Sequence, residues 1–582
     1  MTSPPPVHPK GSRARVLLSS VFGPYARDDD TGSRAVNPME LYQNQVTRVQ
    51  GAFSLRMFHR SFGLMMLQAN MTAPCTLLDF PTLERFTREL ETTAYDIIGI
   101  SAILPNVEKL KIMCALIRRL QPRATIVVGG HIAGAVAAVA CDIDADHIVK
   151  GEGIRWFRQF LGEDPAAPIE HPMALSAFGT RILGIPLSDG PGDTAAILIP
   201  SVGCPVGCNF CATSALFGGK GHFVNFFETG DELFHVMCRM EKELKTRSFF
   251  ILDENFLLHR RRALRLLELM QQHDKSWMLN VFSSARVLRA YTMEQIVGLG
   301  VGWVWMGIEG DGSRYRKLED VDTHALVRRL QSHGIRVLGS SIIGLEDHTP
   351  DTMAAVIDHA VSHATDFHQF MLYTPVPGTP LYETHRTAGT LLDASEMPPA
   401  DVHGQYRFNY RHAHITAGQE EHYLLDAFKA DFTRNGPSLA RLIRTMLTGW
   451  QHYKHHPDPR IRERYRWEAQ PLRTTYAGAI WAMRRYYRHA PAMHEKMHRL
   501  LTDIIAEFGW RTRVAAVVTG IYAYAMLQRE EKRLADGWSY EPAVSYEKNA
   551  AAKALEAAPR HPAPTPIRSI ERPVPAAVAG GE

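Results

Sequence analysis

Residues 201–214 read SVGCPVGCNFCATS and place Cys204, Cys208 and Cys211 in a CxxxCxxC spacing. Cysteine thiolates hold iron–sulfur clusters, normally four of them for each [4Fe–4S] cluster. Three cysteines in one compact loop would leave one iron with an open position, at which a substrate or a cofactor can bind. The alternative is a structural zinc site, which needs four ligands. The nearest additional candidates, His222 and Cys238, lie downstream without a paired spacing.

Short apolar runs alternate with longer helical runs downstream of these cysteines. The strand-like runs are AAILIP (195–200), SFFILDE (248–254), MLNVFSSAR (278–286), GWVWMGIEG (302–310), RVLGSSIIG (336–344) and FHQFMLYTP (367–375). Helical stretches such as RRALRLLELMQQH (261–273) separate them. This alternation predicts a partial or full (β/α) barrel, in which the active site lies at the carboxyl ends of the strands.

A first alternating region precedes the cysteine motif. Its strand-like runs are RVLLSS (15–20), TLLDFP (76–81), DIIGISAI (96–103), TIVVGG (125–130) and HIVKGEG (147–153), with a helical run VEKLKIMCALIRRL at 107–120. The pattern predicts an α/β domain with a doubly wound parallel sheet of the Rossmann or flavodoxin-like type. Such a sheet binds its ligands at the carboxyl ends of the strands.

Composition shifts divide the rest of the chain. The predicted organisation is a disordered segment at 1–12, the first α/β domain at 13–162, a linker at 163–194, the barrel at 195–400, an all-helical domain at 401–547 and a disordered tail at 548–582. The terminal segments are rich in proline or in alanine and proline, which disfavours a packed core. The linker is rich in Pro, Gly and Asp and has no long periodic run.

The overall composition limits the classes of function. The 582 residues include 65 Lys and Arg against 61 Asp and Glu, so the net charge of +4 gives no general attraction to nucleic acid. The N-terminus has no apolar core of a signal peptide, and no apolar run is long enough for a membrane span. The seven cysteines do not form a disulfide framework, which favours a reducing, cytoplasmic compartment.

The cysteine motif, with Phe210 before its last cysteine, resembles the signature of the radical S-adenosylmethionine (SAM) enzymes. The resemblance implies a [4Fe–4S] cluster on Cys204, Cys208 and Cys211, and SAM on the open iron. It also implies that Phe210 approaches the adenine and that an acidic motif holds the SAM amine. The side chains implied as SAM contacts follow successive strands and are Asp253, Glu254, Asn255, Ser283, Ser284, Arg286 and Glu309. Carboxylates suit this role because they accept charge-assisted hydrogen bonds from an ammonium group.

The segment YTPVPGTPLYE (373–383) resembles a motif of the cobalamin-binding radical SAM proteins. The resemblance implies that the first domain binds cobalamin, with contacts from Ser101, Gly129, Gly130, His131 and Glu152. Two departures are visible. The loop SSVFGPYARDDD lacks the family's axial histidine, which implies base-off cobalamin without a protein nitrogen on cobalt. IIGLEDHTP lacks the Pro-Gly of the family's turn after the sixth strand, so the shape of that loop stays open.

The resemblance implies a cobalamin-dependent radical SAM enzyme that transfers a methyl group to an unactivated carbon. No residue is assigned as an acid or a base. The resemblance to hopanoid-modifying relatives and the aromatic-rich helices favour a lipid-like small-molecule substrate. The apolar run at 514–527, beside basic and aromatic residues, adds an expectation of peripheral membrane contact. A flavodoxin or ferredoxin would supply electrons, and no nucleic-acid partner is expected.

Three alternatives stay open. Similar relatives form or contract rings, or couple carbons, without net methylation, and the mass of the product separates these reactions from methylation. A cobalamin-binding sensor with a structural cluster would not cleave SAM. An RNA-modifying enzyme would show a strongly salt-dependent affinity for RNA.

Overall fold

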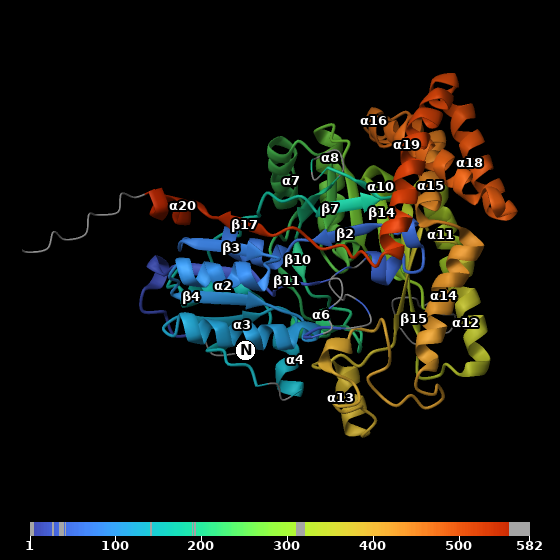
Figure 1. Cartoon of the computed structure of the whole chain (residues 1–582). Coiled ribbons are helices and arrows are strands. Elements are labelled where there is room, and N and C mark those ends of the chain that lie inside the picture. Colours follow the sequence, from blue (N-terminus) through green and yellow to red (C-terminus); the bar gives the residue numbers. More distant parts are fainter. Residues whose placement is uncertain are drawn as a thin grey trace, which may run out of the picture.

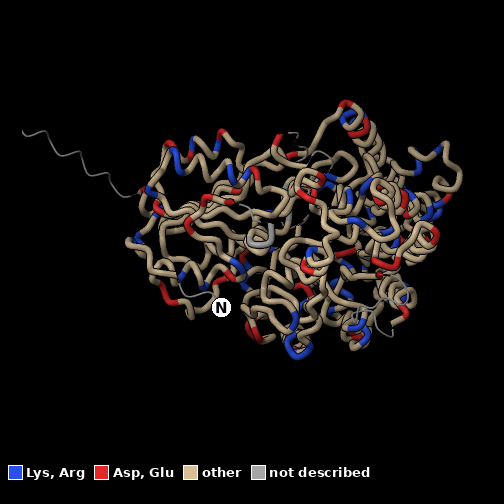
Figure 2. The backbone as a smooth tube through the Cα atoms, turned by 90° about the horizontal axis from the view of Figure 1, so that it is seen from below, with Lys and Arg blue, Asp and Glu red and all other residues tan. Residues whose placement is uncertain are grey.

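The computed structural model describes residues 5–557 except for positions 26, 27, 29, 34, 35, 37–39, 41, 140, 141, 189, 191–193 and 310–320. Two sheets of six strands each dominate this part of the chain, one in the N-terminal half and one in the middle (Figure 1). Lys and Arg are interspersed with Asp and Glu over both halves (Figure 2), in keeping with the small net charge.

The first sheet has the strand order β17-β3-β1-β4-β5-β6. Its five parallel strands are β1 (Val16–Ser20), β3 (Cys75–Asp79), β4 (Ile97–Ser101), β5 (Thr125–Gly129) and β6 (His147–Ile148). The helices between them are α1 (Phe62–Ala69), α2 (Leu83–Thr92), α3 (Val107–Leu120), α4 (Ile132–Val139) and α5 (Gly153–Phe160). Alternate residues of β1 point to opposite faces, so Leu17 packs with α2 and α3, whereas Leu18 packs with α1 and α5. The predicted doubly wound sheet is therefore confirmed.

The sixth strand of this sheet comes from the far end of the chain. Residues of β17 (Ser545–Lys548) pair antiparallel with β3, and α20 (Ala550–Ala557) follows. The prediction of a disordered tail from residue 548 is thus wrong for residues 548–557, because β3 offers an unpaired edge that this polar strand covers. The remainder of that predicted tail lies outside the described residues.

Two other segments expected to lack structure are also ordered. The backbone N–H of His8 donates to the carbonyl of Phe160 at 2.8 Å, and Lys10 pairs with Asp96 at 2.6 Å, so the described part of the 1–12 segment packs on the first domain. The predicted linker contains β7 (Ala177–Ile182) and β8 (Ile185–Pro186), which form a small antiparallel sheet with β2 (Arg56–His59). These strands gain their hydrogen bonds from partners distant in sequence or from a tight turn.

The second sheet is an open, parallel part of a barrel with the order β16-β15-β14-β13-β12-β9. Its strands are β9 (Ala196–Leu198), β12 (Ser248–Ile251), β13 (Met278–Phe282), β14 (Val301–Gly307), β15 (Arg336–Ile343) and β16 (Phe367–Leu372). The helices that follow these strands include α7 (Gly230–Leu244), α8 (Arg260–Gln272), α10 (Met293–Gly298), α11 (Thr323–Ser332) and α12 (Pro350–Ser362). Phe249, Leu279 and Val304 belong to the apolar core between the sheet and these helices. The prediction of a partial barrel is confirmed.

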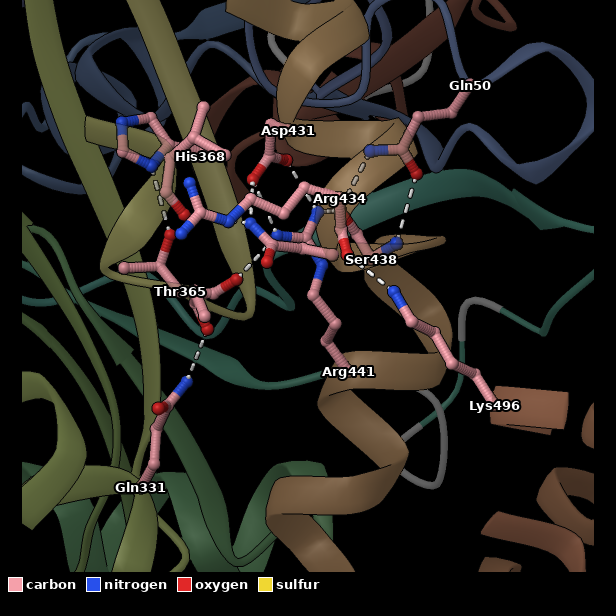
Figure 3. A network of polar contacts seen from close by, with 12 residues as sticks. Gln50, Gln331, Thr365, His368, Asp431, Arg434, Ser438, Arg441 and Lys496 are labelled. Carbon is pink, nitrogen blue, oxygen red and sulfur yellow. Dashed lines mark hydrogen bonds and ion pairs between the residues drawn. The ribbon is translucent and has the colours of Figure 1, made fainter. Parts of the chain in front are cut away.

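The C-terminal region is helical, as predicted. It comprises α13 (Pro380–Thr387), α14 (Gln419–Asn435), α15 (Ser438–Tyr453), α16 (Pro459–Glu468), α17 (Thr475–Tyr486), α18 (Pro491–Phe508) and α19 (Trp510–Ala535). A buried polar network ties it to the barrel (Figure 3): Arg441 pairs with Asp431 at 2.7 Å and donates to the carbonyl of Thr365 at 2.7 Å. None of the helices described here combines the length and the apolar character required to cross a bilayer.

Candidate functional site

The three cysteines lie on a loop between two short strands. β10 (Ser201–Val202) and β11 (Val224–Asn225) pair antiparallel, and α6 (Ala212–Leu216) begins directly after Cys211. The Cys211 sulfur accepts a hydrogen bond from the backbone N–H of Ser214 at 3.4 Å. The Ser214 hydroxyl donates to the carbonyl of Cys204 at 2.9 Å, which ties the first cysteine to the last.

The loop requires glycine at position 207. Gly207 has a φ of +67°, and a Cβ there would lie 2.5 Å from the Cα of Lys220. A larger residue would displace the returning strand of the loop and spread the cysteines.

The chemistry of the loop fits an iron–sulfur cluster. Burial and the charges of the neighbouring thiols raise the pKa of Cys204 to about 11, so three thiolates need positive charge nearby. No three His, Cys, Asp or Glu side chains in the described part of the chain are close enough to hold one ion. A [4Fe–4S] cubane would bind each of the three thiolates at a different iron.

The two acidic residues after β12, Asp253 and Glu254, have different surroundings. Asp253 is buried, pairs with Arg262 at 2.5 Å and accepts a hydrogen bond from the Ser201 hydroxyl. Its charge is therefore already neutralised by the protein, and Asp253 fixes the loop after β12. The sequence did not distinguish it from its neighbour Glu254.

Glu254 lies beside the cysteine loop. Its carboxylate accepts a hydrogen bond from the Gly203 backbone, and its negative charge helps to raise the pKa of Cys204. Burial and the nearby Asp253 charge raise the pKa of Glu254 to about 7. The Oε2 atom is buried and has no hydrogen-bond partner within the protein. A buried carboxylate oxygen of this kind is costly unless a ligand supplies a donor, so the position fits a cation such as an ammonium group.

The other predicted SAM contacts are only partly brought together. The Asn255 side-chain oxygen accepts from the Ser283 hydroxyl at 3.2 Å and from the Ser284 backbone N–H at 3.3 Å. Glu309 is buried two residues beyond the end of β14. Arg286 is solvent-exposed in α9 (Ala285–Arg289), so it is not enclosed with the other groups.

The cysteine loop also contacts the segment after β16. The ring of Phe210 packs at 6.2 Å from that of Tyr373, and the backbone N–H of Leu381 donates to the Asn209 carbonyl at 3.0 Å. The turn after β15, whose shape the sequence left open, is closed by His348. Its Nδ1 accepts from the backbone N–H groups of Gly344 and Leu345 at 3.1 and 3.2 Å.

The segment containing Pro377 and Gly378 joins the two domains. Gly378 has a φ of +88°, and a Cβ there would lie 2.2 Å from the carbonyl oxygen of Gly134 in α4. The two backbones therefore touch, which explains why the motif needs glycine at this position.

A cavity of about 100 Å³ lies at this junction. Residues 103–105 after β4, His131, Gly134 and Ala135 at the start of α4, residues of α6, and residues 376–378 line it. His131 Nε2 is 3.2 Å from the hydroxyl of Thr213 in α6. The carboxyl edge of the first sheet thus faces the helix that follows the cysteine loop, across one shared space.

The residues predicted to contact cobalamin differ in their surroundings. Ser101, Gly129, Gly130 and His131 meet at the carboxyl ends of β4 and β5. At Gly130, a Cβ would lie 2.6 Å from the Ala102 carbonyl oxygen, whereas a Cβ at Gly129 would meet open space. Glu152 caps α5 by accepting from the backbone N–H groups of Ile154 and Arg155, so the fold itself explains this residue.

Sequence reasoning missed an aromatic face on the barrel. Phe250, Phe282 and Trp305 alternate with core residues and lie on the side of the sheet away from the helices. The rings of Phe250 and Phe282 are 5.8 Å apart, and those of Phe282 and Trp305 stack at 5.0 Å. All three side chains are half-buried. The sequence does carry a signal for this aromatic face, because each of the three residues alternates with core residues along its own strand, and the three strands are neighbours in the sheet.

A comparison with protein families bears on the first domain. The family model of the B12 binding domain matches residues 53–161, which include most strands of the first sheet and the helices between them. The first domain is therefore a B12-binding domain, and it is joined to a partial barrel that carries the CxxxCxxC loop.

The chain is similar to several methyltransferases. An uncharacterized methyltransferase of Pyrococcus horikoshii is 23% identical over 335 residues, which cover 51% of this chain and 70% of that protein. The bacteriochlorophyllide d C-12(1)-methyltransferase of Chlorobaculum tepidum is 26% identical over 32% of this chain, and the hopanoid C-2 methylase of Rhodopseudomonas palustris is 25% identical over 33%. These two matches span only 41% and 38% of the relatives' own lengths.

A solved structure is also similar to the chain. The radical SAM methyltransferase TsrM of Kitasatospora setae, with cobalamin and a [4Fe–4S] cluster bound, aligns with a TM-score of 0.47 at 16% identity. The alignment covers 78% of this chain and 99% of TsrM.

Proposed function

We propose that this chain transfers a methyl group from SAM, by way of cobalamin, to an unactivated carbon of a hydrophobic, lipid-like small molecule. The observation that carries the proposal is the junction of the two domains. There α4 of the B12-binding domain and α6 behind the cysteine loop line the same cavity. Two cofactors held on its two sides would face one substrate position, which is a requirement for passing a methyl group to a carbon radical.

Named side chains would hold these groups. Cys204, Cys208 and Cys211 would bind the cluster. Glu254 would accept hydrogen bonds from the SAM ammonium group, because its buried Oε2 otherwise lacks a donor. The remaining proposed cofactor contacts are Phe210, Asn255, Ser283, Arg286 and Glu309 for SAM, and Ser101, Gly129, Gly130 and His131 for cobalamin.

When bound, the cluster with SAM would supply a carbon-centred radical, and cobalamin would supply the methyl group. The protein contributes position and exclusion of water. The Asp253–Arg262 pair fixes the loop that carries Glu254, and the Gly378–Gly134 contact fixes the distance between the domains. We assign no side chain to proton transfer.

The aromatic face supports a hydrophobic substrate. Phe250, Phe282 and Trp305 present adjacent rings on the side of the barrel sheet away from its helices. The ring of Phe250 also packs 5.8 Å from that of His59, and the remaining half-buried ring surface would suit a substrate with an extended apolar or polycyclic body.

Anaerobic reconstitution with iron, sulfide and cobalamin tests the reaction class. We expect reduced protein to release 5′-deoxyadenosine and to add the mass of one CH₂ to the substrate. Cleavage without that mass gain would favour ring formation, ring contraction or carbon coupling. Absence of cleavage, with the cluster present, would favour a sensor. A flavodoxin or ferredoxin is the proposed electron donor.

Comparison of lipid extracts from cells with and without the gene tests the substrate class. We expect at least one lipid to lose a methyl group when the gene is absent. An unchanged lipid profile, with SAM cleavage retained by the purified protein, would reject the lipid substrate and leave the cofactor assignment intact.

A further inference from the structure

One face of α19 exposes a continuous set of apolar side chains. The exposed fraction is 71% for Trp510, 55% for Val514, 64% for Val518, 59% for Ile521 and 56% for Tyr522. Surface apolar residues are ordinarily scattered, and a contiguous group marks an interaction surface. α19 lies at the periphery of the molecule, away from the B12-binding sheet (Figure 1).

The helix geometry explains why these residues are unpartnered within the chain. Thr512, Ala516, Gly520, Ala523 and Leu527 are buried and share one face, which packs chiefly on α17. The exposed residues recur at intervals of three or four on the opposite face. With a rise of 1.5 Å per residue, the apolar stripe from Trp510 to Ile521 is about 17 Å long.

The exposed charges at the two ends of the stripe are positive, whereas Glu530 is buried in a pair with Arg181 and the half-buried Glu531 accepts a hydrogen bond from the Tyr486 hydroxyl. Arg511 and Arg513 are exposed at its start, and Arg529 and Lys532 are exposed beyond its end. Residues 510–529 contain no Asp or Glu. The exposed face of α19 therefore combines a central apolar stripe with cations at both ends.

This charge pattern disfavours a second copy of the chain as the occupant. If two α19 helices packed antiparallel with their stripes aligned, Trp510 of one would lie opposite Ile521 of the other, and Arg511 would border this contact with no carboxylate of the facing stripe to pair with it. If they packed parallel, like residues would meet. The parallel arrangement thus sets cation against cation, and neither arrangement places a carboxylate of the stripe opposite Arg511, which is unfavourable at an apolar contact.

We propose that this face of α19 binds the surface of an anionic membrane, with the helix lying in the plane of the interface. The apolar stripe would enter the boundary between headgroups and acyl chains, where a Trp side chain is favoured. The four cations would contact lipid phosphates at both ends of the stripe. The proposal does not rest on the methyl-transfer reaction, since it needs only the folded chain.

Vesicle flotation tests the proposal with the full-length protein. We expect the protein to float with vesicles of equal parts phosphatidylglycerol and phosphatidylcholine and to bind pure phosphatidylcholine at least several-fold more weakly. A triple variant, Val514→Ser with Val518→Ser and Ile521→Ser, should lower the bound fraction roughly tenfold because the apolar contact is lost. The double variant Arg511→Gln with Arg529→Gln should weaken binding to the anionic vesicles and reduce its dependence on salt.

Matched variants keep the test specific. Val544→Ser and Leu555→Ser remove exposed apolar groups elsewhere, and Arg466→Gln with Arg499→Gln removes exposed cations from α16 and α18. These variants should bind as the unchanged protein does, and circular dichroism should show that every variant is folded. Failure of the unchanged protein to float with anionic vesicles, or flotation unaffected by the triple variant, would overturn the proposal. A dimer in light scattering that only the triple variant dissociates would instead assign the face to a second copy.

Discussion

The Asp253 carboxylate and the Arg262 guanidinium form an ion pair of 2.5 Å in which each side chain is 2% exposed. Arg262 also donates to the carbonyl of Phe227 at 3.1 Å, so it links the loop after β12 to the segment after β11. The pair thereby joins the strand end that carries Glu254 to the segment that closes the cysteine loop. Its function is to position these groups, since both of its charges are satisfied by each other.

Removal of Arg262 should destabilise the fold strongly. The variant Arg262→Met leaves Asp253 buried without its counter-charge, and breaking a buried pair in this way typically costs about 3–5 kcal/mol. Urea unfolding monitored by circular dichroism measures the change. Arg265→Met is the matched control because Arg265 pairs with Asp231 at 2.7 Å on the surface, where solvent screens the two charges and the pair contributes little to stability. Equal losses for both variants would contradict a special role for the buried pair.

Substitution of Glu254 should separate SAM binding from cluster assembly. Glu254→Gln keeps the shape of the side chain but removes the charge that would accept from the ammonium group. Loss of a charge-assisted hydrogen bond of about 1.5–3 kcal/mol predicts a decrease in SAM affinity of roughly ten- to a hundredfold. Equilibrium dialysis against labelled SAM measures the affinity, and iron and sulfide analysis should show an unchanged cluster content. Exposed Glu228→Gln serves as the control; unaltered SAM affinity in Glu254→Gln would remove Glu254 from the site.

Gly378→Ala should disturb the contact between the two domains. A methyl group there would overlap the Gly134 carbonyl oxygen, and the φ of +88° adds strain. Gly389→Ala isolates the contact, because Gly389 has a φ of +67° but nothing within 4 Å of the new Cβ. We expect about 1–2 kcal/mol of destabilisation for Gly389→Ala from the backbone alone and about 1–3 kcal/mol more for Gly378→Ala. Gly378→Ala should also retain less cobalamin after gel filtration, and equal effects of the two variants would argue against the close approach.

The strands that carry the two sheets could be predicted from local pattern. DIIGISAI at 96–103 contains β4, and MLNVFSSAR at 278–286 contains β13, because buried parallel strands are short continuous apolar runs. The pairing of β2 with β7 and of β17 with β3 could not be predicted in this way. Each pairing joins segments more than a hundred residues apart, and the sequences of these strands are polar or mixed. Such edge strands depend on a partner that the local sequence does not indicate.

The site was predictable in composition but not in the division of roles. Motif order brought Asp253 and Glu254 together as acidic candidates, and only the Arg262 contact shows that Asp253 is structural. Arg286 stays a predicted SAM contact, and it is exposed in the first turn of α9. Glu152 was grouped with the cobalamin contacts although it caps α5. The role of Asp253 depends on a partner from α8, and that of Glu152 on the helix that it begins.

The buried His171 should make the fold sensitive to acid. Its Nδ1 donates to the carbonyl of Pro172 and its Nε2 accepts from the backbone N–H of Ile199, each at 2.9 Å, so the ring is neutral. Burial lowers the pKa of His171 to about 4, whereas in the unfolded chain it is near 6.5. The unfolded state therefore binds more protons between these values, and the free energy of unfolding falls as the pH drops from about 6.5 to about 4.

This residue can contribute at most about 3 kcal/mol to that loss. We expect His171→Gln to flatten the decrease in the free energy of unfolding across this window, measured on cofactor-free protein by urea titration at several pH values. The flattening will be partial, because burial also lowers the pKa values of His363 and His403 to about 4. Exposed His235→Gln is the control and should keep the full slope. A variant at position 171 with the same slope as the unchanged protein would show that the ring is protonated as readily in the folded state as in the unfolded one.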